Sequence, residues 1–346
     1  KRQDVMRWLY TGHNVTSNLN FGYGPGDQVR RRVLNTLWNV YAFFSNYARL
    51  DDFDPEAARI PVGQRPDIDR WLMSNLQILV RDARDHYENY DAAAVIKDAE
   101  KFIGDLSNWY VRRNRRRFWR GAGEDDQDKL AAYQTLYDAL LTVIETTAPV
   151  IPFVTDHLYR HLTPADGERW PTSVHLRPFP EVDEDALDED LSFAMDGVVQ
   201  VVHQALALRK SKDLRVRQPL RSLLCVPTDE RTGVAIQRFA DVIAAELNVK
   251  QVKVEGSADG LLSYQVKPDF GKLGRRLGKA TPLVAKAVSA MDHKVLRAAQ
   301  AEERPLPVTV DGVDHLVQPD EYALQAVTPE GLAISETAYG TLALDI

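Results

Sequence analysis

Hydrophobic residues recur every three to four positions through the first half of the chain, with polar residues between them. This spacing is typical of amphipathic helices that turn one side toward a core. Asp27, Pro66, Asp91 and Pro152 stand where capping or first-turn residues are favoured, and Pro149 ends one of the runs. The pattern predicts helices over residues 4–12, 27–49, 66–83 and beyond, 91–120, 126–148 and 152–162. Because the connections are short, we expect antiparallel neighbours in a helical bundle.

The period changes in the second half of the chain. Residues 163–182 are rich in proline and are expected to form an extended crossover, followed by a long helix from 186 to about 213. Beyond Pro219 the pattern favours strands at 223–226, 249–254 and 262–266, helices at 229–247 and 281–301, and a hairpin at 306–317 that turns on Asp311-Gly312. The expected fold class is mainly α: an antiparallel helical bundle followed by a smaller α+β domain.

Arginine is concentrated near the end of the helix expected over residues 91–120. Six of the nine residues from 112 to 120 are arginine. At 100° per residue these side chains share one broad arc with Trp109 and Trp119, while Tyr110 and Phe118 lie on the opposite side. Fixed cations beside flat aromatic rings suit a single-stranded RNA loop, which offers phosphates and unstacked bases. The alternative is a solvated basic face with both tryptophans in the core, and the pattern alone leaves both open.

The charge balance does not oppose this interpretation. The formal net charge is -7, but residues 181–190 contain seven acidic residues and no basic one, so the rest of the chain sums to zero. Segregated charge permits a positive patch on an acidic protein.

Cysteine usage and hydropathy exclude several classes of protein. Cys225 is the single cysteine, so the chain has no internal disulfide and no cysteine-based zinc ribbon, and its apolar surroundings favour an inert buried thiol. The first residues are charged and no run of 18 apolar residues occurs. We therefore expect a cytoplasmic protein without a leader or a membrane span.

Two segments resemble phosphate-binding motifs only superficially. The glycine-rich stretch 18–26 follows a helix-like segment and lacks the required spacing, and residues 271–279 lack the first glycine and the Ser/Thr of a P-loop. No nucleophile and base stand together, so no catalytic residue and no metal ligand is predicted.

Eight segments together resemble class I isoleucyl-tRNA synthetases, in the portion that follows the catalytic domain. They lie in the family's order at residues 4–8, 18–22, 35–41, 107–119, 173–176, 216–220, 246–250 and 267–279. The chain looks most similar to the eukaryote-like subgroup, which lacks a zinc-binding C-terminal tail. The family's HIGH and KMSKS signatures are missing, and Arg209-Lys210-Ser211-Lys212-Asp213 only imitates the second, because it follows the bundle instead of preceding it.

The resemblance implies a fragment that binds tRNA but does not catalyse. Residues 1–26 would be the remnant of a joining segment, 27–182 the anticodon-binding bundle, 183–218 a connecting helix and 219–346 the C-terminal module. The full enzyme would use ATP and Mg²⁺ to charge tRNA-Ile with isoleucine, whereas this piece would need no cofactor and show no pyrophosphate exchange. Its expected partners are the anticodon stem-loop of tRNA-Ile and the missing catalytic domain of the same chain, and we expect a monomer.

The candidate RNA-binding residues follow from the basic segments and the resemblance. Stacking platforms are expected at Trp109 and Trp119. Phosphate and base contacts are expected from Arg112, Arg113, Arg115, Arg116 and Arg117, and from a second basic surface comprising Arg215, Arg217, Lys272, Arg275, Arg276 and Lys279. The alternatives are the matching region of a valyl- or leucyl-tRNA synthetase, a sequence-indifferent RNA binder, and a protein-interaction scaffold whose basic helix docks an acidic partner.

Overall fold

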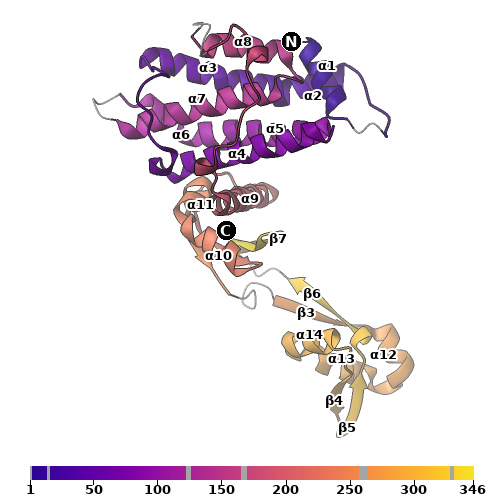
Figure 1. Ribbon diagram of the computed structural model, residues 1–346. Helices are drawn as coiled ribbons and strands as arrows, with labels where there is room; N and C mark the ends of the chain where they lie inside the picture. The colour runs from indigo at the N-terminus through magenta and orange to yellow at the C-terminus, as the bar shows by residue number, and fades with distance from the viewer. Residues whose placement is uncertain (1, 14–15, 122–125, 165–169, 257–262, 328–330) are drawn as a thin grey trace. The chain divides into compact units, whose positions relative to one another are not determined.

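The computed structural model describes residues 2–13, 16–121, 126–164, 170–256, 263–327 and 331–346 (Figure 1). The chain forms two compact units, residues 1–196 and residues 197–346. We call them unit 1 and unit 2 and describe each by itself.

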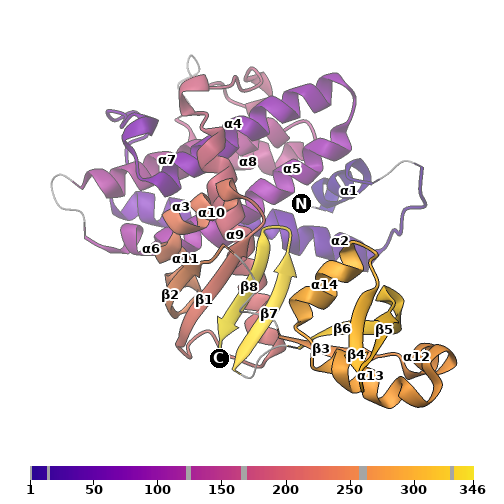
Figure 2. The same ribbon diagram turned by 90° about the horizontal axis from the view of Figure 1, so that it is seen from below.

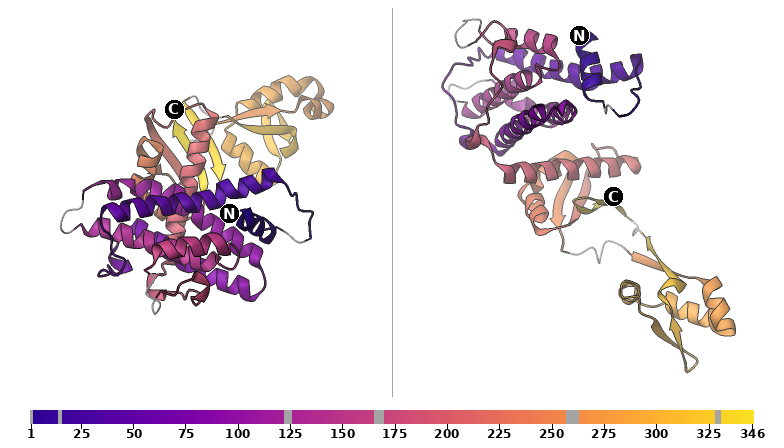
Figure 3. Two further views of the ribbon diagram at one scale, coloured as in Figure 1. Left: turned by 90° about the horizontal axis from the view of Figure 1, so that it is seen from above. Right: turned by 45° about the vertical axis from the view of Figure 1, so that its right-hand side comes forward.

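Unit 1 is a helical bundle. Figures 1 and 3 show its helices side by side, and α7 packs against α3, α4, α6 and α8. Its helices are α1 (Arg2–Thr11), α2 (Tyr23–Val29), α3 (Asn35–Leu50), α4 (Asp67–Glu88), α5 (Ala92–Asp105), α6 (Arg112–Trp119), α7 (Gln127–Thr147) and α8 (Pro152–Leu162). Two π-helical turns, η1 (Arg30–Leu34) and η3 (Leu106–Val111), and three 3-10 turns, η2 (Val62–Gln64), η4 (Val174–Leu176) and η5 (Glu184–Ala186), complete it.

Local signals explain where some of these helices begin. The side chain of Asp91 accepts a hydrogen bond from the backbone N–H of Ala94, as expected of an N-cap, and Pro152 occupies the first turn of α8. The expected cap at Asp27 is wrong, because the helix begins at Tyr23, inside the glycine-rich stretch. Asp27 therefore lies within a helix, where it pairs with Arg30 and Arg31 three and four positions on.

The long helix α9 (Glu189–Ser211) begins three residues later than expected. The carboxylate of Asp188 accepts the backbone N–H of Leu191, and residues 184–186 form η5 instead of helix. Among the described residues, α9 alone is long and apolar enough to span a membrane by length and composition. However, 61% of its most apolar 18-residue stretch is buried inside the protein. Such burial is typical of a core helix. The boundary between the two units falls within α9.

Unit 2 contains a four-stranded sheet in the order β2-β1-β8-β7, which Figure 2 shows side by side. Its strands are β1 (Leu220–Pro227), β2 (Val249–Val254), β7 (Leu332–Thr337) and β8 (Gly340–Asp345). The strands β1 and β2 are parallel, and the crossover between them contains α10 (Glu230–Arg238) and α11 (Ala240–Leu247). The single helix expected over 229–247 is thus two helices, because Phe239 leaves the helical conformation.

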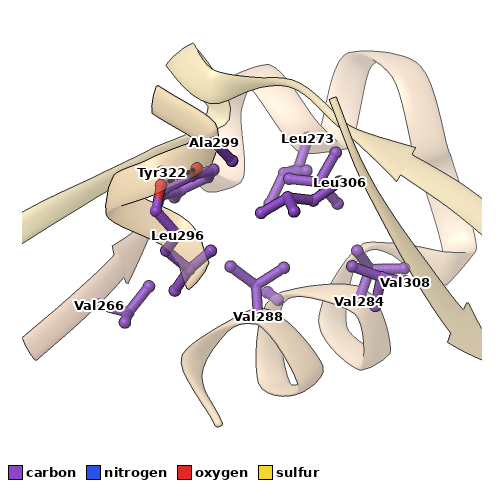
Figure 4. Packing of buried hydrophobic residues seen from close by; sticks show 11 residues of the cluster. Val266, Leu273, Val284, Val288, Leu296, Ala299, Leu306, Val308 and Tyr322 are labelled. Carbon is purple, nitrogen blue, oxygen red and sulfur yellow. Dashed lines mark hydrogen bonds between the residues drawn. The ribbon is translucent and has the colours of Figure 1, made fainter. Parts of the chain in front are cut away.

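Residues 263–327 of unit 2 have a hydrophobic core of their own, to which Leu273, Val284, Leu296 and Tyr322 contribute (Figure 4). Its elements are β3 (Ser263–Pro268), α12 (Phe270–Leu277), η6 (Gly278–Ala280), α13 (Thr281–Ser289), α14 (His293–Ala301), β4 (Leu306–Val310), β5 (Val313–Val317), η7 (Pro319–Glu321) and β6 (Tyr322–Val327). The strands β3 and β6 pair antiparallel, as do β4 and β5.

The hairpin predicted from Asp311-Gly312 is confirmed. Both residues have positive φ, 51° and 78°, as a two-residue turn of this type requires. The helix expected over 281–301 is interrupted between α13 and α14. The expected class, a helical bundle followed by a smaller α+β part, is confirmed.

Candidate nucleic-acid interface

The arginine-rich segment is the end of one continuous helical stretch. It runs from α5 through the π-helical turn η3 into α6. A π-helical turn holds more residues than an α-helical turn, so a uniform 100° projection misplaces the residues in and after it. The faces of α6 must therefore be taken from the structure.

The helical projection at 100° per residue places Trp109 on the same arc as the arginines, and this placement is wrong. Its side chain is only 2% exposed, so the indole is not available as a platform for RNA bases. The guanidinium carbons of Arg112 and Arg113 lie 5.8 and 5.2 Å from the centre of its ring. Trp109 therefore supports two arginines from the inside, by cation–π contact.

The guanidinium group of Arg117 also binds to residues in the interior of the bundle. Its two terminal nitrogens donate to the two carboxylate oxygens of Asp69 over 2.7 and 2.8 Å, and Asp69 is fully buried in α4. Arg117 also pairs with Asp128 of α7, at 2.8 Å, and the hydroxyl of Tyr110 donates to Asp69 over 2.7 Å. Burial alone lowers the pKa of Arg117, but the hydrogen bonds and charge of Asp69 outweigh it, so the pKa is raised. This network anchors α6 to α4 and α7.

The exposed residues of α6 form one face. Arg112, Arg115, Arg116 and Trp119 are all exposed, Trp119 by 57%. They occupy positions i, i+3, i+4 and i+7, which lie together on one side of an α-helix. We call these four residues the arginine face. Within the part of the chain that the structure describes, Arg115 and Arg116 have no acidic partner.

The remaining arginines of this segment are partly occupied. Arg113 is half-buried beside Trp109. Arg120 is exposed, but it pairs with Asp126 at 2.7 Å and with Asp128 at 2.6 Å. Much of the charge of this residue is therefore already balanced.

The expected second basic surface lies in unit 2 and divides into two segments. Arg215 and Arg217 are exposed in the loop between α9 and β1. On α12, Lys272 pairs with Asp320 at 2.9 Å and Arg276 with Glu321 at 2.6 Å. The hydrogen bond that Lys272 donates to Asp320 raises the pKa of Lys272, and the hydrogen bonds that Arg276 donates to Glu321 raise the pKa of Arg276.

Arg275 and Lys279 are exposed near these pairs. Neither has an acidic partner among the residues that the structure describes. Two of the four cations of this segment are thus neutralised and two are not.

Sequence reasoning missed the residues that hold the basic segments in place. Asp69 lies within the amphipathic helix expected over residues 66–83, and its partner Arg117 is 48 positions away. Its one local signal is an acid at the start of α4 among apolar residues, which is also typical of a first-turn helix residue.

The described residues offer little for metal or thiol chemistry. No group of three or more His, Cys, Asp or Glu side chains among them is placed to hold a metal ion. Cys225 is buried in β1, and burial raises the pKa of its thiol to about 12.

Comparison with known proteins gives this geometry a context. Residues 69–224 match the family described as the anticodon-binding domain of tRNA ligase, and this range includes Asp69 and all of α6. Many curated proteins also match the chain, among them bacterial isoleucine–tRNA ligases.

Three of these relatives illustrate the match. The isoleucine–tRNA ligase of Bacteroides thetaiotaomicron is 36% identical over 99% of this chain and 29% of its own length. That of Porphyromonas gingivalis is 40% identical over 86% of this chain and 26% of its own length. That of Deinococcus radiodurans is 40% identical over 99% of this chain and 31% of its own length. The chain thus spans about 30% of the length of the relatives that cover it fully. Over nearly its whole length the chain is similar to a part of isoleucine–tRNA ligases, and its residues 69–224 match the anticodon-binding domain family.

Proposed function

We propose that this chain is the tRNA-binding portion of an isoleucine–tRNA ligase and that its arginine face contacts the anticodon stem-loop of tRNA-Ile. One observation carries the proposal: three exposed arginines and an exposed tryptophan lie on one side of α6, within the matched anticodon-binding domain. The domain boundaries given above, at residues 26, 182 and 218, belong to the same proposal.

The chemistry of these side chains supports binding to a single-stranded loop. Arginine presents a planar fork of N–H donors that fits phosphate oxygens, and an exposed indole can stack on an unpaired base. The ion pair of Arg117 with Asp69 and the contacts of Trp109 hold the face rigid. A rigid site loses less conformational entropy when it binds.

The second basic surface extends the proposal to unit 2. Arg215, Arg217, Arg275 and Lys279 are exposed cations available for phosphate contacts. Lys272 and Arg276 would have to exchange an acidic partner for RNA, so we expect weaker contributions from them.

The reaction of the whole enzyme is part of the proposal. It would activate isoleucine with ATP, with Mg²⁺ at the phosphates, and transfer it to tRNA-Ile in the cytoplasm. The catalytic domain of the same polypeptide would carry that chemistry, while this chain binds the RNA as a monomer. The alternative regions from valyl- or leucyl-tRNA synthetases are less well supported, because the relatives from Bacteroides thetaiotaomicron and Deinococcus radiodurans, which match 99% of the chain, are isoleucine–tRNA ligases.

The first test is a titration with the anticodon stem-loop of tRNA-Ile and with hairpins carrying altered anticodon bases, each at two salt concentrations. We expect the native loop to bind at least several-fold more tightly, with the preference persisting at the higher salt. Equal binding of all hairpins would favour a sequence-indifferent RNA binder, and no binding to any hairpin would favour the protein-interaction scaffold.

The matched variants are Arg116→Glu and Lys97→Glu. Both reverse one exposed charge in the same continuous helical stretch, but Lys97 lies 19 residues earlier, roughly 28 Å along the helix. Arg116→Glu should weaken native-hairpin binding roughly tenfold, because a phosphate contact becomes a repulsion. Lys97→Glu should change it less than twofold, since that distance exceeds the screening length. Equal effects of the two variants would remove the arginine face from the site.

A further inference from the structure

The segment that imitates a KMSKS signature contains an unusual residue, Arg209. Its side chain is fully buried near the C-terminal end of α9. Among the described residues it has no carboxylate partner, and its Nε has no hydrogen-bond partner. A buried guanidinium without an acid is costly unless other acceptors satisfy it.

Backbone carbonyl groups satisfy this guanidinium instead. One terminal nitrogen of Arg209 donates to the carbonyl of Arg215 over 2.6 Å and to that of Gln218 over 2.5 Å. The other donates to the carbonyl of Leu247 over 3.2 Å, at the C-terminal end of α11, where a cation is favoured. The planar fork of arginine therefore ties a loop to the end of a helix, which the single ammonium of a lysine would do less well.

The loop held in this way is residues 212–219, which we call the basic loop. A second clamp acts on it, because the side chain of Asn248 donates to the carbonyl of Val216 over 3.0 Å. Asp213 has a φ of 55° where the chain leaves α9, and the N–H of Gln218 donates to the carbonyl of Arg215. Three backbone carbonyl groups of the loop thus accept hydrogen bonds from the side chains of Arg209 and Asn248.

The side chains of the same loop are exposed. Lys212, Arg215 and Arg217 all lie at the surface, although the carbonyls of residues 215, 216 and 218 point to buried or clamped donors. The only acid in the loop is Asp213. A buried cation without an acid also adds positive potential beneath this surface.

We propose that Arg209 is a positioning residue that holds the basic loop in the conformation presenting Arg215 and Arg217 to the phosphates of RNA. The inference rests on the proposed function for the identity of the ligand. Arg209 itself is buried and touches no RNA; it acts through the carbonyls of Arg215 and Gln218.

The experiment is a double-mutant cycle in the full chain, with the anticodon stem-loop of tRNA-Ile as the probe. One arm is Arg209→Met, which removes the three donated hydrogen bonds, and the other is the pair Arg215→Gln and Arg217→Gln. We expect each arm alone to weaken binding roughly fivefold and to reduce the slope of log affinity against log salt by up to about 1.4, the value for two phosphates on a single strand. In the protein that already carries Arg215→Gln and Arg217→Gln, Arg209→Met should weaken hairpin binding less than twofold.

Two further variants separate positioning from general destabilisation. Asn248→Gly removes the second clamp, and glycine tolerates the positive φ of 50° at this position, so the variant should fold even if Arg209→Met does not. It should likewise weaken binding only while Arg215 and Arg217 are present. Arg209→Lys should restore part of the affinity lost in Arg209→Met, because it keeps the charge and at least one donor.

The outcomes distinguish the two proposals. In one outcome the parent chain binds the hairpin and the pair Arg215→Gln and Arg217→Gln weakens this binding. If Arg209→Met and Asn248→Gly then weaken binding equally with and without the Gln pair, the positioning role is overturned and the tRNA-binding function stands. If the parent chain binds no hairpin, the tRNA-binding function and this role both fail.

Discussion

Arg117 and Asp69 form the buried contact on which the orientation of the arginine face depends. Both carboxylate oxygens of Asp69 accept hydrogen bonds from Arg117, and one of them also accepts a hydrogen bond from the hydroxyl of Tyr110. Burial raises the pKa of Tyr110 well above its ordinary value, so the phenol stays a donor. A pair of this kind is expensive to break on one side only, because the charge that remains is largely shielded from solvent.

The first residue-scale prediction concerns Asp69→Asn. It should lower the free energy of unfolding by about 3–5 kcal/mol, because Arg117 loses its buried counter-charge. Urea unfolding followed by circular dichroism measures this change. Arg120→Gln is the matched control, since it removes the pairs of an exposed arginine with Asp126 and Asp128 and should cost less than about 1 kcal/mol. Equal costs would mean that the buried pair does not anchor α6.

The second residue-scale prediction concerns Cys225, whose pKa is raised by burial to about 12. At pH 8 the native thiol should react with an alkylating reagent far more slowly than the thiol of the urea-unfolded chain, because the thiolate is the nucleophile. The folded pKa lies above the unfolded one, so the neutral thiol stabilises the fold below about pH 9 and this stability is lost as the pH rises toward 12. Rapid alkylation of the folded protein at pH 8 would contradict this prediction.

Local signals located many elements but not all of their limits. The cap at Asp91, the proline at the start of α8 and the Asp311-Gly312 turn act within a few residues, so sequence reasoning found them. The π-helical turn η3 has no comparable local signal, and it determines which side of α6 faces the core. The strands β7 and β8 were not expected, because β8 pairs with β1 more than 100 positions earlier.

An element-scale prediction follows from this pairing. A Cβ added at Gly340 would lie 2.1 Å from the carbonyl oxygen of Val226 and 2.8 Å from the Cα of Pro227, and Gly340 has a φ of 125°. Gly340→Ala should therefore destabilise the sheet by about 2–5 kcal/mol, through the clash and the backbone strain.

Gly104→Ala provides the control with the opposite sign. Gly104 lies within α5, and a Cβ there would meet no atom within 4 Å. This change should stabilise the protein by about 0.5–1 kcal/mol, because alanine loses less conformational entropy in a helix. Thermal unfolding of both variants is the measurement, and a stable Gly340→Ala protein would show that the approach of β8 to β1 can relax.

For the whole molecule, the net charge is a poor guide to its partners. The total is -7, yet the arginine face carries three exposed positive charges and no acid. Seven acidic residues are concentrated between 181 and 190, in a different segment of the chain. Local charge, and not the total, determines how a polyanion is attracted.

The whole-molecule prediction concerns salt. If three to four phosphates are neutralised, affinity for the native hairpin should fall roughly 20- to 50-fold as salt rises from about 50 to 200 mM, despite the negative net charge. Fluorescence anisotropy at several salt concentrations measures the slope. The triple change of Arg112, Arg115 and Arg116 to Gln should flatten it, and an affinity independent of salt would contradict the assignment of phosphate contacts.

The sequence by itself determined the helical bundle, the following α+β part, the hairpin, the resemblance to isoleucyl-tRNA synthetases and the existence of a basic helix. These follow from periodicity, turn residues and motifs, which act over short stretches or are visible as sequence. The tertiary structure decided which cations are available: Arg115 and Arg116 are exposed, whereas Arg117 is bound to Asp69 and Trp109 is buried. The physical reason is that burial and ion pairing depend on residues that are distant in the chain and become neighbours only when the helices pack.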